Sequence, residues 1–328
     1  MEKELVEKKG YPIKFIDIRG FRRSFSLENI KTVFMVFKSK GQAKELMRAF
    51  RPDVVLCTGG YVSGPVMCAA KSMHIPCMIH EQNVIPGVTV KMAARYATKI
   101  AVSFEGTYDY LKKDRAKCVL TGNPIREELL QADRALSRRK LKLDNRPLIF
   151  AFGGSLGADK INETMLEFIK SNEQRGGKYQ ILFGCGKRYY DKVMEQAAQL
   201  GIDTKDQRTA RIVDYIDDMG AAMAAADIII SRAGAITTSE IAALGKVSIL
   251  IPSPNVAHDH QTYNALALYQ NEAGIMIREN ELTTKLLETK VDKLLGNPAL
   301  YNKMAENCKK IGQPDAVKKM YDTMRYMI

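Results

Sequence analysis

The chain has 328 residues, of which 46% are hydrophobic and 27% charged, a normal composition for a globular enzyme with room for two α/β domains. It contains no run of 18 apolar residues and no apolar segment behind its charged N-terminus, so we expect no membrane span, no signal peptide and a cytoplasmic location. Its 6 cysteines and 4 histidines form no metal-ligand spacing, so no disulfide and no metal site are predicted.

The formal net charge of +13 predicts an anionic partner. Nucleic acid and the surface of an anionic membrane are the two candidates. The sequence has no zinc-finger spacing, aromatic RNA-binding motif or recognisable DNA-binding helix pair, so we expect no nucleic acid. Residues 1–50 hold 12 lysines and arginines against 6 acidic residues, so the positive charge leans toward the N-terminal part of the chain.

The first 50 residues are predicted to form a helix over residues 2–9, a strand over residues 13–18 and a helical region over residues 21–50. In the helical region Ile30, Phe34 and Phe37 share one face, and this face is bordered by the basic residues Arg22, Arg23 and Lys38. An apolar face with a basic border is typical of a membrane-surface patch. A helix that buries its apolar face in the core and exposes its basic side would give the same pattern.

Two features of the first half indicate ligand binding. A strand over residues 52–57 runs into a glycine turn and then a small-residue helix, an arrangement that often cradles phosphate; the turn reads Thr58-Gly59-Gly60-Tyr61-Val62-Ser63-Gly64-Pro65. A strand over residues 75–79 leads to four consecutive polar side chains, His80-Glu81-Gln82-Asn83. Sugar hydroxyls need both donors and acceptors, so this loop suits sugar recognition, although a purely structural hydrogen-bond network would look similar.

The second half is predicted to repeat the strand and glycine-turn pattern. After two short strands over residues 99–103 and 117–121 and a polar linker over residues 131–146, a strand over residues 148–152 precedes the turn Gly153-Gly154-Ser155-Leu156-Gly157-Ala158. Ser155 lies where a hydroxyl can bind phosphate at the start of the following helix. Two such units predict two similar Rossmann-like domains.

The segment of residues 226–265 is the most informative stretch. Strand residues 228–230 are followed by a break at residues 231–235, a helix with Thr237, Thr238 and Ser239 near its start, and a strand over residues 247–251. The helix N-terminus points its free N–H groups at the carboxyl edge of the sheet, where they favour an anion. Arg232 is expected to reinforce a diphosphate site and Glu240 to accept ribose hydroxyls, whereas a capped helix with a solvated glutamate is the simpler alternative.

Six motifs resemble those of the MurG family of bacterial glycosyltransferases: Arg-Ala-Gly-Ala-Ile-Thr-Thr-Ser-Glu, Asp-His-Gln-Thr-Tyr-Asn-Ala, Gly-Gly-Tyr-Val-Ser-Gly-Pro, His-Glu-Gln-Asn, Gly-Asn-Pro-x-Arg and Gly-Gly-Ser-Leu-Gly-Ala. The resemblance covers nearly the whole chain. It implies a GT-B architecture of two Rossmann-like domains that face a cleft. It also implies inverting transfer of N-acetylglucosamine from UDP-N-acetylglucosamine to the 4-hydroxyl of undecaprenyl-linked N-acetylmuramoyl-pentapeptide in peptidoglycan synthesis.

The resemblance also implies roles for individual residues. Those expected to bind UDP-N-acetylglucosamine are Asn83, Arg126, Ser155, Tyr215, Ile216, Arg232, Ala235, Ile236, Thr237, Thr238, Ser239, Glu240 and Gln261. Those expected to contact the acceptor are Gly59, Gly60, Tyr61, Ser63, His80 and Glu81. Within the donor set, Tyr215 and Ile216 would line the uracil pocket, and Gln261 would bind the sugar hydroxyls. Residues 1–127, with a returning helix over residues 315–328, would face acceptor and membrane, and residues 128–314 would bind the nucleotide sugar.

The chain departs from the family pattern at several points. The family's proposed base is a histidine in a Gly-Gly-Thr-Gly-Gly-His loop after the first strand, and this sequence has no such segment. We therefore expect a first domain truncated at its N-terminus and assign no catalytic base; His80 and Glu81 are substitutes without a geometric argument. Val90 and Phe183 stand where polar residues are common. No Asp-x-Asp triplet occurs, so no metal or other cofactor is expected.

These departures keep two other functions open. A truncated, membrane-docked protein that binds a UDP-sugar without catalysis would retain the donor motifs. Another UDP-sugar glycolipid synthase would share the architecture, although the His-Glu-Gln-Asn and Gly-Gly-Tyr-Val-Ser-Gly-Pro motifs argue against it. The main interpretation places the protein at the cytoplasmic face of the cell membrane as a peripheral protein, with other cell-wall synthesis proteins as further partners.

Overall fold

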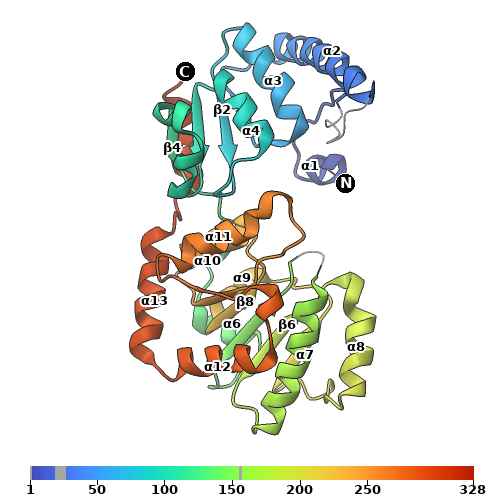
Figure 1. Ribbon diagram of the computed structural model, residues 1–328, viewed down its shortest axis with the longest axis vertical. Helices are drawn as coiled ribbons and strands as arrows, with labels where there is room; N and C mark the ends of the chain where they lie inside the picture. The colour runs from blue at the N-terminus through green and yellow to red at the C-terminus, as the bar shows by residue number, and fades with distance from the viewer. Residues whose placement is uncertain (1, 19–26, 155–156) are drawn as a thin grey trace.

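A computed structural model describes residues 2–18, 27–154 and 157–328, without the side chains of residues 2, 5 and 27–34. The predicted roles of Arg22, Arg23 and Ser155 therefore lie outside the described residues, as do those of the Ile30 and Phe34 side chains. The chain forms two lobes, and each is built around a parallel sheet (Figure 1). The α/β class is confirmed.

The N-terminal lobe has a four-stranded sheet in the order β1-β2-β3-β4. Its strands are β1 (Val55–Cys57), β2 (Cys77–Glu81), β3 (Lys99–Val102) and β4 (Cys118–Leu120). Its helices are α1 (Glu2–Lys8), α2 (Leu27–Phe50), α3 (Gly60–Ser72) and α4 (Val88–Ala93), with 3₁₀ turns η1 (Ala94–Tyr96), η2 (Glu105–Tyr110) and η3 (Lys112–Lys117). Helix α2 packs on α3, and α3 lies against the sheet (Figure 1).

Two predictions about this lobe are wrong. Residues 13–18 pair with no strand of the described chain, so their alternating pattern does not form a sheet; Asp17 is held instead on α2 by Lys38, whose Nζ lies 2.8 Å from its carboxylate, and by Gln42. His80 and Glu81 belong to strand β2 rather than to the loop after it. Since β2 has neighbours on both sides, all its residues are buried.

The C-terminal lobe has a six-stranded parallel sheet in the order β10-β9-β8-β5-β6-β7. Its strands are β5 (Leu148–Phe152), β6 (Gln180–Gly184), β7 (Ala210–Val213), β8 (Ile228–Ser231), β9 (Ser248–Leu250) and β10 (Ile275–Met276). The helices that follow the first lobe are α5 (Glu127–Leu130), α6 (Arg134–Lys140), α7 (Asp159–Gln174), α8 (Tyr190–Gln199), α9 (Met219–Ala225), α10 (Ala235–Leu244), α11 (His260–Tyr269), α12 (Thr284–Leu295), α13 (Pro298–Ile311) and α14 (Ala316–Arg325).

Helices cover both faces of this second sheet, so its strands are apolar on both sides. Ile149 and Ala151 of β5 face a core shared with α7 and α12, while Phe150 and Phe152 face a core shared with α9, α10 and α11. This alternation is the two-residue repeat of a strand. The arrangement fixes the carboxyl ends of β5, β8 and β9 along one edge of the sheet.

Two segments cross between the lobes. Ile125 and Leu129 pack in the core of the second lobe, so Arg126, which lies between them, belongs to the second lobe. At the other end of the chain, α14 returns to the first lobe, where Met320 packs against Met78 and Ala101 of the sheet (Figure 1).

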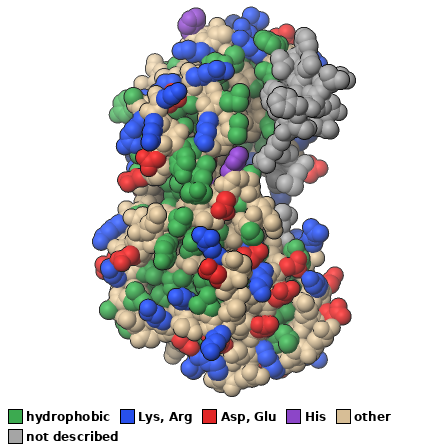
Figure 2. All heavy atoms as spheres, in the orientation of Figure 1, with side chains coloured by type: hydrophobic (Ala, Val, Ile, Leu, Met, Phe, Trp, Pro, Cys, Tyr) green, Lys and Arg blue, Asp and Glu red, His purple; other side chains and the backbone are tan. Residues whose placement is uncertain are grey.

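Lysine and arginine side chains are spread over both lobes on the face shown in Figure 2, and the lobes meet at a narrow waist. Within the described part of the chain, no helix combines the length and the apolar character that a membrane span requires.

Candidate donor and acceptor site

Helix α10 presents its N-terminus at the carboxyl edge of the second sheet. Strand β8 ends at Ser231, Gly234 is the N-cap, and no described side chain caps the helix. Thr238 does not serve as a cap because its hydroxyl donates to carbonyl oxygens of Gly234 and Ala235. The first N–H groups of α10 are thus left for a ligand, and the helix dipole favours an anion there.

A cavity of about 620 Å³ lies beside this helix N-terminus. Gly234 and Thr237 line one side of it, and the glycine turn after β5 lines another. Gly157 has φ +76°, and a Cβ atom there would lie 2.4 Å from the carbonyl oxygen of Cys185. Only glycine fits this position, because the turn packs directly against the backbone that follows β6.

Arg232 lines the same cavity, but its guanidinium is occupied by protein groups. Nη1 donates to the carbonyl oxygens of Ile251 at 3.2 Å and Pro252 at 3.1 Å, and Nη2 pairs with the carboxylate of Glu279. The side chain is 13% exposed. Arg232 therefore holds the loop after β9 against β8, and its charge is balanced by Glu279, a residue that the sequence did not single out.

Arg126 and Glu240, both predicted to bind the donor, contact each other. The Nε and Nη2 atoms of Arg126 each lie 3.1 Å from Oε1 of Glu240. Arg126 is half-exposed, whereas the Glu240 side chain is 7% exposed. Burial raises the pKa of Glu240, and the guanidinium opposes this rise.

Gln261 also lines the cavity. Its Oε1 accepts a hydrogen bond of 2.9 Å from the backbone N–H of Ser253, so the amide Nε2 is the end that can serve a ligand. Two consecutive residues just before it, His258 with φ 57° and Asp259 with φ 50°, adopt left-handed backbone conformations that non-glycine residues rarely take.

The two residues predicted for the uracil pocket lie after β7, away from this cavity's lining. Tyr215 is 53% exposed, with the Lys187 ammonium 5.3 Å from its ring centroid. Ile216 packs over the end of β6, where a Cβ on Gly184 would be 3.0 Å from its Cγ1. Ile236, by contrast, is exposed on the first turn of α10.

The predicted acceptor turn starts helix α3. Gly59 and Gly60 have φ +92° and +74°, and a Cβ at either would meet no described atom within 4 Å. Tyr61 is 64% exposed and available to a ligand. Ser63 is buried and donates its hydroxyl to the Gly59 carbonyl oxygen, so we correct its predicted role from acceptor contact to support of the turn.

The predicted acceptor contacts of His80 and Glu81 are also corrected, because each residue is only 2% exposed. His80 Nε2 lies 3.0 Å from Ser103 Oγ and 3.2 Å from the Gly122 carbonyl oxygen. The Glu81 carboxylate accepts the backbone N–H groups of Asn83 and Gly87, both at 2.9 Å. These side chains shape the loop that carries Asn83, and burial lowers the pKa of His80.

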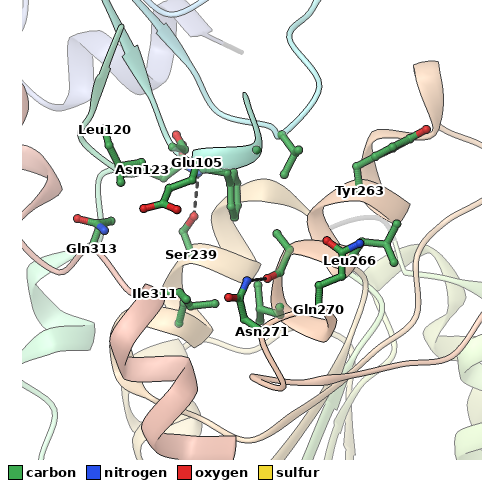
Figure 3. Close-up of a pocket in the computed structure, with 18 of the residues that line it drawn as sticks. Glu105, Leu120, Asn123, Ser239, Tyr263, Leu266, Gln270, Asn271, Ile311 and Gln313 are labelled. Atoms are coloured by element: carbon green, nitrogen blue, oxygen red, sulfur yellow. Dashed lines mark hydrogen bonds between the residues drawn. The ribbon is translucent and has the colours of Figure 1, made fainter. Parts of the chain in front are cut away.

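Two fully buried asparagines tie the lobes together, and sequence reasoning gave neither a role. Asn123 Nδ2, from the first lobe's side, lies 2.9 Å from Ser239 Oγ and 3.3 Å from the Ala235 carbonyl oxygen on α10 (Figure 3). Asn264, on α11 of the second lobe, reaches across to the first lobe, where its Nδ2 contacts Oδ1 of Asn83. Both asparagines occur within motifs noted in the sequence, but their partners lie more than 100 residues away.

A second cavity of about 510 Å³ lies between the lobes, beside the Asn123 and Ser239 contact (Figure 3). Tyr110 from the first lobe and Tyr263 from the second meet edge to face, with ring centroids 6.5 Å apart. Gln313 contributes from the crossing segment. Ala235 and Ser239 of α10 therefore lie in direct contact with the first lobe.

Two Rossmann-like domains that face each other, with a glycine turn and a free helix N-terminus at the carboxyl edge of the second sheet, define the GT-B class of glycosyltransferases. The glycosyltransferase family 28 N-terminal domain matches residues 1–102, and the glycosyltransferase family 28 C-terminal domain matches residues 148–320. The chain belongs to glycosyltransferase family 28, and within it to the MurG group.

Similar proteins and a solved structure support the assignment to this group. The UDP-N-acetylglucosamine–N-acetylmuramyl-(pentapeptide) pyrophosphoryl-undecaprenol N-acetylglucosamine transferase of Caldanaerobacter subterraneus subsp. tengcongensis is 44% identical over 99% of this chain and 88% of its own length. The transferase of the same name from Clostridioides difficile is 40% identical over 98% of this chain and 78% of its own length. The crystal structure of Acinetobacter baumannii MurG superposes with a TM-score of 0.78 at 30% identity, over 99% of this chain and 88% of that one.

Proposed function

We propose that this protein transfers N-acetylglucosamine from UDP-N-acetylglucosamine to the 4-hydroxyl of undecaprenyl-diphospho-N-acetylmuramoyl-pentapeptide, the lipid I to lipid II step of peptidoglycan synthesis. The proposal is supported by the relatives, which are named for this transfer and match the chain almost end to end. The observation that carries it in the structure is the 620 Å³ cavity at the N-terminus of α10, the helix that Asn123 joins to the first lobe.

The donor diphosphate would lie at the N-terminus of α10 and the turn after β5. Backbone N–H groups and the helix dipole stabilise the negative charge that grows on UDP as the glycosidic bond breaks. Arg126 adds a cation at the edge of this site, and Glu240, which it holds, offers a carboxylate to ribose hydroxyls. Gln261 would donate its amide to the sugar, and Tyr215 and Ile216 would border the base.

The acceptor would approach from the first lobe, over the Gly59 and Gly60 turn and the exposed ring of Tyr61. Attack by its 4-hydroxyl on the face of the anomeric carbon opposite UDP inverts the configuration and forms a β-1,4 bond. A general base assists such a step. His80 and Glu81 are poor bases in this geometry, because both are buried and their polar atoms are already hydrogen-bonded, so we assign the base to no residue.

We also propose that the first lobe contacts the cytoplasmic face of the bacterial membrane. Phe37 on α2 is 70% exposed, and Lys38 next to it keeps its ammonium at the surface, paired with Asp17. An exposed aromatic ring beside basic groups suits insertion into an anionic headgroup layer. A lipid-linked acceptor lies in that layer, so this contact would deliver it to the cleft.

Donor selectivity tests the proposal. In calorimetric titrations, UDP and UDP-N-acetylglucosamine should bind, while ADP should bind at least about tenfold more weakly, because the proposed contacts of Tyr215 and Ile216 are with uracil and not with a purine. Absence of UDP-N-acetylglucosamine binding would contradict the proposal. A non-catalytic UDP-sugar-binding protein would give the same titrations, so an assay of sugar transfer to the lipid-linked acceptor separates the two functions.

A further inference from the structure

Helix α14 covers one face of the first sheet. In strand β2, Cys77 and Ile79 pack in the core that the sheet shares with α3 and α4, and Met78 between them faces the opposite side. Met78 packs with Ala101 of β3 and Met320 of α14, and no member of this trio is more than 6% exposed. The burial of Met78 therefore depends on a helix from the far end of the chain.

The side chains that the C-terminal segment brings to this cluster are all methionines. Met324 and Met327 pack against the trio beside Met320, and both are half-buried, whereas Met78 has no exposed surface. We call Met78, Met320, Met324 and Met327 the methionine contact. A thioether is apolar and flexible, so it fills an uneven contact between a helix and a sheet. An oxidant converts the same group to a polar sulfoxide.

Among the described residues, no polar contact anchors α14 to the first lobe. Its ion pairs, of Lys318 with Asp322 and of Lys319 with Asp315, stay within the C-terminal segment. Its side-chain hydrogen bonds also end within residues 313–325. The attachment of the helix to the sheet is therefore a matter of apolar packing.

Close packing against the backbone fixes the start of the helix. Ala316 is buried, and a Cβ on Gly122, just after β4, would lie 3.3 Å from the Cβ of Ala316. In the part of the chain that the structure describes, the later turns pack on the sheet through the methionine contact. Met324 and Met327 are its more exposed members, so an oxidant in solution meets these two sulfurs before the buried pair.

We propose that Met324 and Met327 are oxidation sites that control whether α14 is docked on the first lobe. Hydrogen peroxide transfers one oxygen atom to the sulfur: the O–O bond breaks, the sulfur loses two electrons and water leaves. The sulfoxide oxygen is an acceptor without a donor in this apolar contact, so its burial is unfavourable. The oxidised helix therefore leaves the sheet, exposes Met78 and Met320, and frees one of the two segments that cross between the lobes.

Limited digestion with trypsin tests the inference, because Lys318 and Arg325 are exposed on α14 and a short helix that leaves its sheet unravels. The protein is treated with hydrogen peroxide, its sulfoxides are mapped by mass spectrometry, and cleavage within residues 317–325 is timed. Cleavage should become at least about tenfold faster once Met324 and Met327 are oxidised, since proteolysis follows the population of the undocked helix. The two methionine sulfoxide reductases, one for each epimer, should restore the slow rate.

Matched variants separate this effect from general oxidative damage. Met324→Leu with Met327→Leu keeps the contact apolar but cannot be oxidised, so this double variant should stay slowly cleaved after peroxide treatment. Met92→Leu removes a thioether that is 57% exposed on α4, and it should leave the acceleration unchanged. Equal acceleration in the unchanged protein and the leucine double variant would overturn the inference, as would slow cleavage of protein in which both methionines are oxidised.

A polar substitution decides the question without an oxidant. Met324→Gln buries an amide in the methionine contact and should speed cleavage of α14, whereas Met92→Gln places the same amide at an exposed position and should not. This pair also decides if the leucine double variant is itself cleaved quickly. Equal cleavage rates in the two glutamine variants would contradict control of docking by this contact.

Discussion

Arg126 and Glu240 form an ion pair in which two guanidinium nitrogens each lie 3.1 Å from one carboxylate oxygen. The pair joins the segment between the lobes to the middle of α10, and the Glu240 side chain is almost completely buried. Among the described residues, no hydrogen bond reaches the other oxygen of this carboxylate, which leaves it for hydroxyl groups. The pair thus connects the crossing segment to the helix whose N-terminus borders the donor cavity.

Glu240→Gln should weaken UDP and UDP-N-acetylglucosamine binding by the same factor. The amide still accepts from Arg126 but replaces charge-assisted bonds to ribose with neutral ones, a loss of roughly 1 kcal/mol or about fivefold in affinity. Because burial raises the pKa of Glu240, UDP affinity of the unchanged protein should also fall on acidification, and the glutamine variant should lack that part of the pH dependence. Calorimetry at two pH values measures both effects; loss of affinity for UDP-N-acetylglucosamine but not UDP would contradict the ribose role.

Gly157→Ala should destabilise the turn after β5. The residue has φ +76°, and its new Cβ would lie 2.4 Å from a backbone oxygen, so strain and overlap together should cost roughly 2–4 kcal/mol of the free energy of unfolding. Gly154→Ala is the matched control: φ is +86°, but a Cβ there would meet no described atom within 4 Å, so it should cost only about 1–2 kcal/mol. Urea unfolding compares them. Equal losses would show that overlap with Cys185 is unimportant.

His80 should make the protein less stable in acid. Burial lowers the pKa of the folded His80 below the ordinary 6.5, so the unfolded chain binds the proton first as pH falls, and proton binding favours unfolding. The free energy of unfolding should therefore drop between pH 7.5 and 5.5 by more in the unchanged protein than in His80→Gln. His74→Asn removes an exposed imidazole and should leave the drop as it is. A drop that is the same in all three proteins would contradict this assignment.

Phe37→Glu should reduce binding to vesicles that contain anionic lipid by at least about tenfold, since an inserted aromatic ring is replaced by a charge of the wrong sign. Phe50→Glu is the control. Phe50 is 77% exposed on the same helix but lies about 140° around its axis from Phe37, away from the proposed contact. Vesicle co-sedimentation measures both variants, and equal loss in both would mean that α2 has no membrane-facing side.

The sequence predicted the local units of the fold because their signals are local. The run Ile228-Ile229-Ile230 lies in β8, and α10 ends at Leu244 before its C-cap Gly245, whose φ of 62° is the left-handed conformation that glycine favours. The two-domain α/β architecture and the glycosyltransferase family are confirmed. These features depend on neighbours in the chain and on motifs that can be read directly.

The predictions that failed depend on partners distant in sequence. Residues 13–18 alternate as a strand should, but no described strand pairs with them, and alternation alone cannot supply a partner. His80 was expected in an open sugar-binding loop because its polarity is visible, whereas the flanking strands β1 and β3 that bury it are not. The bond between Asn264 and Asn83 spans 181 residues, so only the folded chain shows it.

The measurement that tests the account most directly is sugar transfer by this chain from UDP-[¹⁴C]-N-acetylglucosamine to a lipid-linked N-acetylmuramoyl-pentapeptide. The released UDP and the labelled disaccharide lipid are both quantified. Diacylglycerol is present as a competing acceptor. The account predicts that UDP and lipid-linked disaccharide appear in equal amounts and that diacylglycerol remains unlabelled. Donor binding without transfer would identify a UDP-sugar-binding protein, and labelled diacylglycerol would identify another glycolipid synthase; either result would contradict the account.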